Sequence, residues 1–294
     1  MSLRDRNLSG GMGGAVAAGV GIAPGPTGTP PGAYRGRGLG EGFGKTDRND
    51  AWWVLPVLQG IGLVCLIGYA NYAAIFGAAH YHFIDNGRDY LSPFYSPYLG
   101  GFSWRPLWLS PALLVLIWPL GFRTTCYYYR KAYYRSFFHD PIGCAVGEYR
   151  EKYAGETKFP FILQNIHRYF LYAALVILVI LWSDVVRAAM FADHSGHAHF
   201  GIGGGTLAIL ASTFTLTLYT LSCHSLRHLV GGGLDCFSCA VAGGPRQRGW
   251  SFLSALNGHH MGYAWMSLFA VCFADAYVRL CSMGILHDPV FFTI

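Results

Sequence analysis

The sequence predicts an all-α integral membrane protein, in which a bundle of five transmembrane helices with a cytoplasmic N-terminus follows a flexible Gly- and Pro-rich arm. Three observations support this prediction. Of the 294 residues, 53% are hydrophobic and only 12% are charged, whereas a soluble domain carries about 25% charged residues. Five apolar segments approach the length of about 20 residues that a helix needs to cross a bilayer. The basic residues gather in alternate connecting segments.

The arm is expected over residues 1–50. It contains the stretch GGMGGAVAAGVGIAPGPTGTPPGAYRGRG, which lacks the periodicity of a helix or a strand. Its apolar part, AVAAGVGIA, is followed by prolines and not by a small-residue cleavage site, so it is not interpreted as a signal peptide.

The first three helices are expected at about 52–79, 107–129 and 160–182. No Asp, Glu, Lys or Arg occurs between Asp50 and Asp85, which favours a spanning helix there. The second segment contains Pro111 and Pro119, which predict kinks.

The last two helices are expected at about 207–226 and 258–281, within a membrane domain over 51–284, and a short outer tail is expected over 285–294. The fourth segment lies in an uncharged stretch, and the fifth ends with Asp275 and Arg279. These two residues are four positions apart and can neutralise each other on one helix face. No internal repeat is apparent.

The orientation follows from the basic residues. With a cytoplasmic N-terminus, seventeen of the 21 Lys and Arg residues fall in the arm or in the loops after the second and fourth helices. This asymmetry is typical of a plasma-membrane protein with those segments inside. The net charge of +6 is therefore interpreted as topological, with lipid as the surrounding partner and no nucleic acid bound.

Cysteines and histidines of four helices fall at one level near the inner face. They are Cys126, His167, Cys223, His224, His228, His259 and His260. Polar residues at such depth are candidates for function. Thiolate and imidazole ligands suit zinc or an iron–sulfur cluster, and a Rieske-type [2Fe–2S] centre takes two Cys and two His. Cys126 and Cys223 are the candidate sulfur ligands. The sequence does not decide which two of the five histidines in this set would be the nitrogen ligands.

Other motifs carry weaker signals. Cys236 and Cys239 form a single CxxC in a Gly-rich loop, which is interpreted as incidental because no second CxxC completes a zinc ribbon. The HSGHAH segment, residues 194–199, is expected to be a solvated turn, and the following GIGGG a flexible entry to the fourth helix.

Aromatic and polar side chains also gather at the inner interface. An aromatic belt explains most of them, but a quinone head group also needs hydrogen-bond donors beside apolar walls. The candidates for quinone binding are Trp52, Tyr127, Arg130, Gln164, His167 and Arg168.

Four stretches, TTCYYYRKAYYRSFF, FPFILQNIHRYF, LSCHSLRHLVGGGL and NGHHMGYAWMSL, resemble the five-helix membrane anchor of succinate dehydrogenase or fumarate reductase. The resemblance is to the variety that holds a Rieske-type cluster instead of haem, and it extends over about residues 40–284. It implies an electron-transfer subunit of a succinate:quinone oxidoreductase, inactive on succinate alone. Its implied partners are a flavoprotein subunit, an iron–sulfur subunit and ubiquinone or menaquinone.

The resemblance also implies the ligands of the cluster. They are Cys126, Cys223, His228 and His260, with His167 and His224 as alternates. Three other interpretations stay open: an anchor of the same class with haem b, a His-rich membrane di-iron oxidase or hydroxylase, and a transporter or structural protein without metal. The haem interpretation leaves the inner cysteines unexplained, and the di-iron interpretation needs about eight inner imidazoles, more than the chain supplies.

Overall fold

The protein is described by a computed structural model over residues 42–77, 79–85, 87–99, 110–139, 142–148, 159, 161–192 and 197–294. Leu39–Ile294 forms one compact unit. Most of the expected arm over 1–50, and the start of the expected span 107–129, lie outside the described residues.

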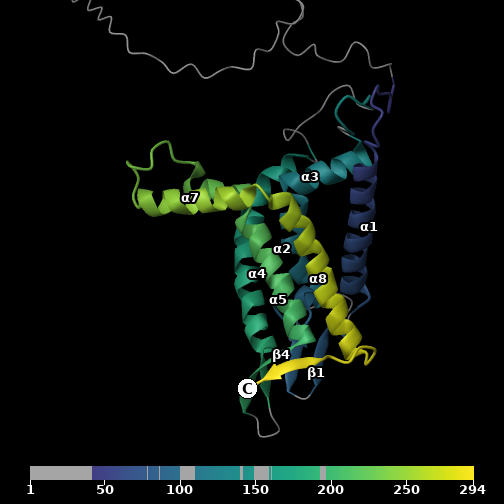
Figure 1. Ribbon diagram of the computed structural model, residues 1–294, viewed down its shortest axis with the longest axis vertical. Helices are drawn as coiled ribbons and strands as arrows, with labels where there is room; N and C mark the ends of the chain where they lie inside the picture. The colour runs from purple at the N-terminus through teal and green to yellow at the C-terminus, as the bar shows by residue number, and fades with distance from the viewer. Residues whose placement is uncertain are drawn as a thin grey trace, which may run out of the picture. The chain divides into compact units, whose positions relative to one another are not determined.

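The unit is a bundle whose long helices run side by side (Figure 1). They are α1 (Val54–Ile75), α2 (Pro111–Thr124), α4 (His167–Ala188), α5 (Gly204–Leu221) and α8 (His260–Ser282). Within the described ranges, four helices are long and apolar enough to cross a membrane, namely α1, α4 with its preceding turn, α5 and α8. The second expected span, 107–129, differs, because α2 has 14 residues and its length of about 21 Å falls short of the ~30 Å hydrocarbon core.

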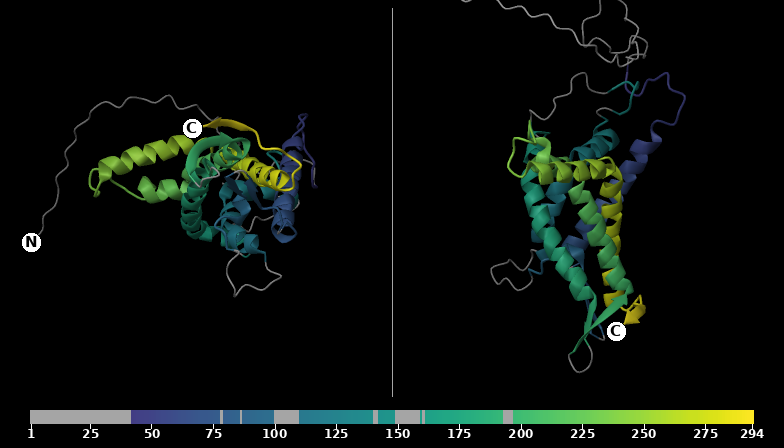
Figure 2. Two further views of the ribbon diagram at one scale, coloured as in Figure 1. Left: turned by 90° about the horizontal axis from the view of Figure 1, so that it is seen from below. Right: turned by 60° about the vertical axis from the view of Figure 1, so that its left-hand side comes forward.

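Shorter helices cover one end of the bundle, called here the inner end because the charge distribution predicts it to be cytoplasmic. They are α3 (Tyr127–Tyr133), η2 (Tyr134–Phe138), η4 (Phe161–Ile166), α6 (His224–Arg227), η5 (His228–Gly232) and α7 (Gly243–Asn257). Figures 1 and 2 show α7 lying across the direction of the long helices. The sequence predicts a loop in place of α7. The helix packs back on η5, where the Nε of Arg246 donates to the carbonyl of Val230 at 2.7 Å.

The opposite, outer end contains strands, so the all-α prediction is wrong there. An antiparallel pair, β1 (His82–Asp85) and β2 (Arg88–Leu91), is followed by the 3-10 turn η1 (Pro93–Tyr95). A second antiparallel sheet has the order β3 (Met190–Ala192), β4 (Ala198–Gly203), β5 (Val290–Thr293). The segment expected as a solvated turn thus continues into β4, and the expected outer tail forms β5. These strands have three to six residues, too few for a period-two pattern to stand out in the sequence.

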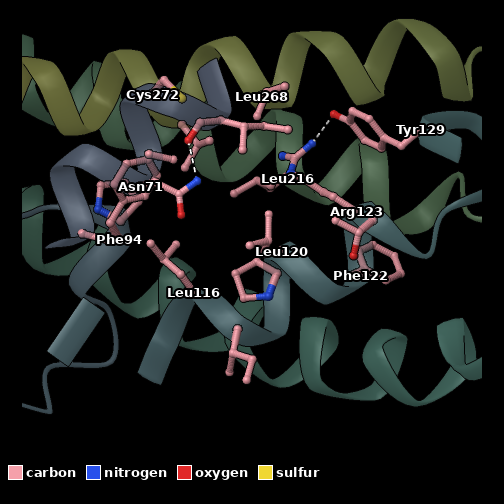
Figure 3. A pocket seen from close by; sticks show the side chains of 18 of the residues that line it. Asn71, Phe94, Leu116, Leu120, Phe122, Arg123, Tyr129, Leu216, Leu268 and Cys272 are labelled. Carbon is pink, nitrogen blue, oxygen red and sulfur yellow. Dashed lines mark hydrogen bonds between the residues drawn. The ribbon is translucent and has the colours of Figure 1, made fainter. Parts of the chain in front are cut away.

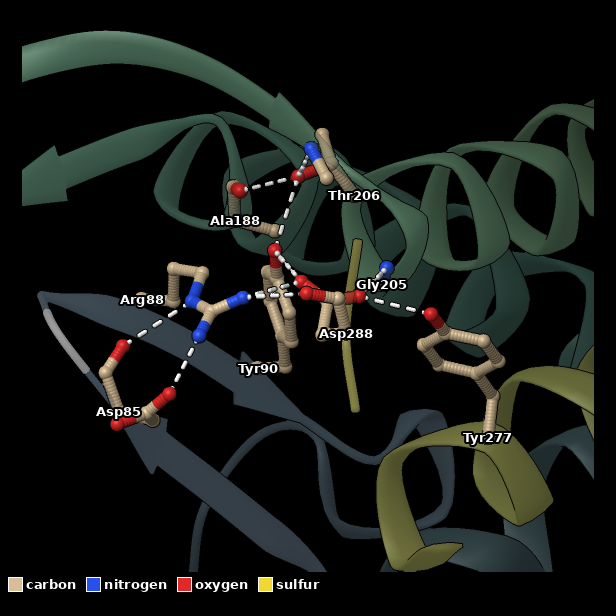
Figure 4. A network of polar contacts seen from close by, with 9 residues as sticks. Asp85, Arg88, Tyr90, Ala188, Gly205, Thr206, Tyr277 and Asp288 are labelled. Atoms are coloured by element: carbon tan, nitrogen blue, oxygen red, sulfur yellow. Dashed lines mark hydrogen bonds and ion pairs between the residues drawn. The ribbon is translucent and has the colours of Figure 1, made fainter. Parts of the chain in front are cut away.

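Asp288 fastens the outer end together (Figure 4). Its buried carboxylate accepts hydrogen bonds from Arg88 NH1 at 3.0 Å, from the hydroxyls of Tyr90 and Tyr277, and from the backbone N–H of Gly205 at 2.7 Å. A Cβ on Gly205 would lie 2.3 Å from the Tyr90 ring. The glycines at the start of α5 therefore allow close packing at this helix N-terminus. They are not the flexible entry expected from the sequence.

The outside of the bundle is apolar. Large hydrophobic side chains point outward from the long helices, among them Ile61 at 57% exposure, Val179 at 72% and Phe273 at 60%. Exposed apolar surface of this extent marks a membrane-facing region. The interior contains a separate core of alanines, leucines and aromatic residues, to which α1, α2, α3, α4, α5 and α8 contribute.

Candidate metal centre

Two helix breaks with the same geometry lie at the inner end of the bundle. Cys126 separates α2 from α3 with φ −65° and ψ 131°, and Cys223 separates α5 from α6 with φ −65° and ψ 134°. Both cysteines are buried, at 3% and 2% exposure. Each one directly precedes the first residue of a short helix, so the two expected spans are broken at the two candidate sulfur ligands.

A hydroxyl residue stands immediately before each cysteine. The Thr125 hydroxyl donates to the carbonyl of Gly121 at 2.7 Å, and the Ser222 hydroxyl donates to the carbonyl of Tyr219 at 3.0 Å. Such bonds from Ser and Thr to the preceding turn compete with the helical pattern and favour a helix end.

Two histidines complete the arrangement. The Nε2 of His167, the first residue of α4, lies 3.2 Å from the sulfur of Cys223. The Nε2 of His260, the first residue of α8, lies 3.4 Å from the sulfur of Cys126. Each sulfur thus faces the imidazole of a helix distant in the sequence.

The hydroxyls fix the tautomers of both rings. The Thr125 oxygen lies 2.9 Å from Nδ1 of His167, and the Ser222 oxygen lies 2.7 Å from Nδ1 of His260. Because each hydroxyl already uses its proton on a backbone carbonyl, it accepts from the imidazole, and Nδ1 carries the hydrogen. The lone pair of each ring is then on Nε2, which faces a sulfur. This is the tautomer that a metal-binding histidine needs.

Aromatic rings support both imidazoles. Phe122 stacks on His167 with ring centres 4.7 Å apart, and Tyr219 stacks on His260 with ring centres 5.0 Å apart. Phe122 and Tyr219 each lie four residues before the cysteine of their own segment. The segments Phe-Arg-Thr-Thr-Cys and Tyr-Thr-Leu-Ser-Cys are therefore structural equivalents, although no repeat is apparent in the sequence.

The four donors form two Cys–His pairs. No three His, Cys, Asp or Glu side chains of the described residues lie close enough together to hold a single metal ion. The pairs are adjacent, because the hydroxyl that binds one imidazole directly precedes the cysteine that faces the other. Burial raises the pKa of the Cys223 thiol to about 11, and a bound metal would displace that proton.

One buried polar atom at the centre is unpaired. The hydroxyl of Tyr219 is buried, has no hydrogen-bond partner among the described residues and lies beside Cys126. An unpaired buried donor is costly, and a metal-bound sulfur would accept its proton. The donor set, two thiols and two Nε2 atoms, is that of a Rieske-type cluster, and the residues fit such a group.

The structure does not bring His224 and His228 to this centre. Both side chains are exposed and lie near arginines, with Nδ1 of His228 3.4 Å from Arg168 and Nδ1 of His224 3.4 Å from Arg227. His167, an alternate candidate from the sequence, takes the position that His228 was expected to fill. Cys236 and Cys239 form a disulfide with each other and contribute nothing to the centre.

The residues predicted to bind quinone are dispersed over the inner end. Gln164 donates to the hydroxyl of Tyr133 at 2.7 Å, and Arg130 is buried against the ring of Tyr127, which is itself 71% exposed. Arg168 is exposed beside His228, and Trp52 lies near Gly143.

A cavity of about 590 Å³ opens between the long helices next to the centre (Figure 3). Its walls are mainly apolar and include Leu116, Leu120, Leu216 and Leu268. Near one end it is bounded by Phe122, Tyr129 and Tyr219 together with the guanidinium of Arg123. The charge pattern of the sequence places Arg123 among the cytoplasmic loop charges, but its side chain points into the bundle.

Five residues of this region were not predicted from the sequence: Phe122, Arg123, Thr125, Ser222 and Tyr219. The hydroxyl before each cysteine and the aromatic residue four positions earlier are visible in the sequence. Their meaning depends on which histidine faces which cysteine, and that information is in the fold alone.

Comparison with known proteins gives consistent results. Residues 54–284 match the family model described as actinobacterial succinate dehydrogenase subunit SdhC. A chain of the Mycobacterium smegmatis Sdh1 complex in the apo form is 40% identical, with a TM-score of 0.74, and the match covers 84% of this chain and 94% of that one. No curated protein matches the chain.

Proposed function

The chain belongs to the family of actinobacterial succinate dehydrogenase subunit SdhC, and we propose that it passes electrons to quinone through a [2Fe–2S] cluster ligated by Cys126, Cys223, His167 and His260. As a family member with several apolar helices, it is a multi-pass membrane anchor of the bacterial plasma membrane. A succinate dehydrogenase complex is an enzyme, of which this chain is one subunit.

The proposal is carried by one observation, the pair of hydroxyl–imidazole–thiol chains at the inner end. Each chain presents an Nε2 lone pair and a sulfur to each other at 3.2 or 3.4 Å. Polar groups inside an apolar bundle cost free energy, so their presence at this depth indicates a function. The set of two thiols and two imidazoles, with no three donors of the described residues in reach of one ion, favours a binuclear centre over mononuclear zinc; such a centre would take both thiolates on one iron and both imidazoles on the other.

The residues have distinct roles in this proposal. Cys126 and Cys223 bind iron as thiolates, and the two imidazoles bind iron through Nε2. Thr125 and Ser222 hold the rings in the required tautomer. The cluster, when bound, supplies one-electron transfer.

The cavity supports the quinone part of the proposal. Its apolar walls suit an isoprenoid tail and its volume of about 590 Å³ lies in the range of small-molecule sites, about 300–1,000 Å³. It reaches Phe122 and Tyr219, the rings that stack on the two histidines. A ligand there would be separated from the centre by single side chains. The electrons would come from an iron–sulfur subunit at the inner end, supplied by a flavoprotein subunit.

The test is a low-temperature electron paramagnetic resonance spectrum of the purified, dithionite-reduced complex, with an optical spectrum and iron analysis. We expect a Rieske-type signal and no haem Soret band. His167→Ala should abolish the signal, whereas the matched variant His228→Ala should retain it with unchanged iron content. A strong Soret band without the cluster signal would move the chain to the haem-bearing anchors, and loss of the signal in H228A alone would refute the ligand assignment.

A further inference from the structure

Arg123 is a charged side chain inside the apolar bundle, in the last turn of α2 and on the wall of the cavity (Figure 3). Its NH1 donates to the hydroxyl of Tyr129 at 2.6 Å and to the carbonyl of Ala264 at 3.2 Å, and its NH2 donates to the hydroxyl of Ser267 at 3.0 Å. These contacts tie α2 to α3 and α8. They leave the guanidinium held in one position.

The three acceptors of Arg123 are neutral oxygens, whereas two fully buried arginines have carboxylate partners. Arg88 is paired with Asp85 and Asp288, and Arg279 is paired with Asp275 at 2.8 Å. Within the ranges that the structure describes, no carboxylate forms an ion pair with Arg123. Arg123 is half-buried, and a charge inside an apolar bundle without a counter-ion is costly, so a negative charge is expected nearby in the working protein.

The candidate metal centre lies directly beside this guanidinium. The Arg123 side chain lies over the Tyr219 ring, 4.8 Å from its centre. That ring stacks in turn on His260 at 5.0 Å. One ring, that of Tyr219, thus separates the fixed positive charge from a proposed iron ligand.

The charge of the proposed cluster provides the missing partner. Two ferric ions, two sulfides and two thiolates, with neutral imidazoles, sum to zero in the oxidised form. One electron from a partner iron–sulfur subunit would make the reduced form singly negative. We propose that Arg123 is the counter-charge for this electron and so sets the reduction potential of the cluster; the inference rests on the function proposed above. Arg123 is a positioning residue, since it touches no ligand atom.

The test compares Arg123→Gln with Arg123→Lys in the full complex by redox titration of the paramagnetic signal. Both variants lose the forked guanidinium that donates to Tyr129, Ala264 and Ser267, but only the glutamine variant loses the charge. At a given solution potential we expect about a tenfold lower reduced-to-oxidised ratio in R123Q, equivalent to about 59 mV for one electron. R123K should stay near the wild type. Arg187→Gln, at the exposed outer end of α4, is the matched control and should not change the titration.

A second variant covers the case in which R123Q does not assemble. Ser267→Asp places a carboxylate beside NH2 of Arg123 and neutralises the charge without removing the side chain, so the same downward shift is expected. A wild-type titration curve in R123Q or S267D would overturn this inference while leaving the cluster in place. Absence of the signal from the wild type would instead refute the proposed function.

Discussion

Replacing Thr125 with Val tests whether the hydroxyl residues before the cysteines organise the centre. Valine has nearly the same shape but neither donates nor accepts. The carbonyl of Gly121 keeps another donor, since the backbone N–H of Thr125 lies 3.0 Å from it. The substitution therefore acts mainly on His167, whose Nδ1–H loses its acceptor at 2.9 Å.

The expected magnitude follows from that single lost contact. A buried donor left without a partner costs about 1–3 kcal/mol, and loss of an outer-shell partner of a metal-bound histidine lowers metal affinity by about 10- to 100-fold. These two figures agree, because a factor of ten corresponds to about 1.4 kcal/mol. The ring is also free to adopt the tautomer with its hydrogen on Nε2, which cannot bind iron.

The assay is retention of iron by the detergent-solubilised complex against increasing concentrations of a chelator. The chelator concentration that removes half of the iron should be about 10- to 100-fold lower for Thr125→Val than for the wild type. Thr125→Ser, which keeps the hydroxyl, should behave as the wild type, and Thr124→Val is the neighbouring control. If T125V retains iron within about twofold of the wild type, the hydroxyl does not orient His167 and the proposed tautomer lock is refuted.

Three further predictions concern other parts of the chain. Asp288→Ala removes the carboxylate that accepts from Arg88, Tyr90, Tyr277 and the backbone of Gly205, while Arg88 keeps Asp85. Because each buried donor left without an acceptor costs about 1–3 kcal/mol, we expect a lower thermal unfolding temperature while the paramagnetic signal of the intact complex persists. Leu216→Trp narrows the cavity and should reduce quinone reduction but leave succinate oxidation by an artificial dye acceptor unchanged; equal losses in both assays would contradict the assignment of the cavity to quinone. The double variant Cys236→Ser/Cys239→Ser should keep its full iron content, because this pair is bonded to itself.

Apolar run lengths located the membrane helices from the sequence, since burial in lipid demands about 20 consecutive apolar residues. Four of the five expected spans coincide with long apolar helices. The breaks at Cys126 and Cys223 were missed because each lies only three residues before the expected end of its span, at 129 and 226, and because the side-chain bonds to the preceding turn do not alter hydropathy. The strands of the outer end were missed because they are held by contacts distant in sequence, such as those of Asp288.

The candidate centre was predictable in composition but not in pairing. Depth along the helices placed Cys126, Cys223, His167 and His260 at one level, which narrowed the candidates. Depth does not distinguish His167 from His228, because both lie near the inner face. The difference lies in direction, since His167 begins a long helix that faces the bundle, whereas His228 follows a helix of four residues that leads away into α7.

The repeated geometry indicates why a membrane anchor would break two of its helices at the same level. A cysteine in a continuous helix directs its sulfur back along the helix surface toward the N-terminus, where the preceding turn occupies the space in front of it. At a break, the extended backbone of Cys126 and Cys223 leaves each sulfur free to face a histidine at the start of another helix. Each preceding hydroxyl ends one helix and orients one imidazole. One short sequence pattern, used twice, thus supplies both the helix breaks and the Cys–His arrangement of the proposed centre.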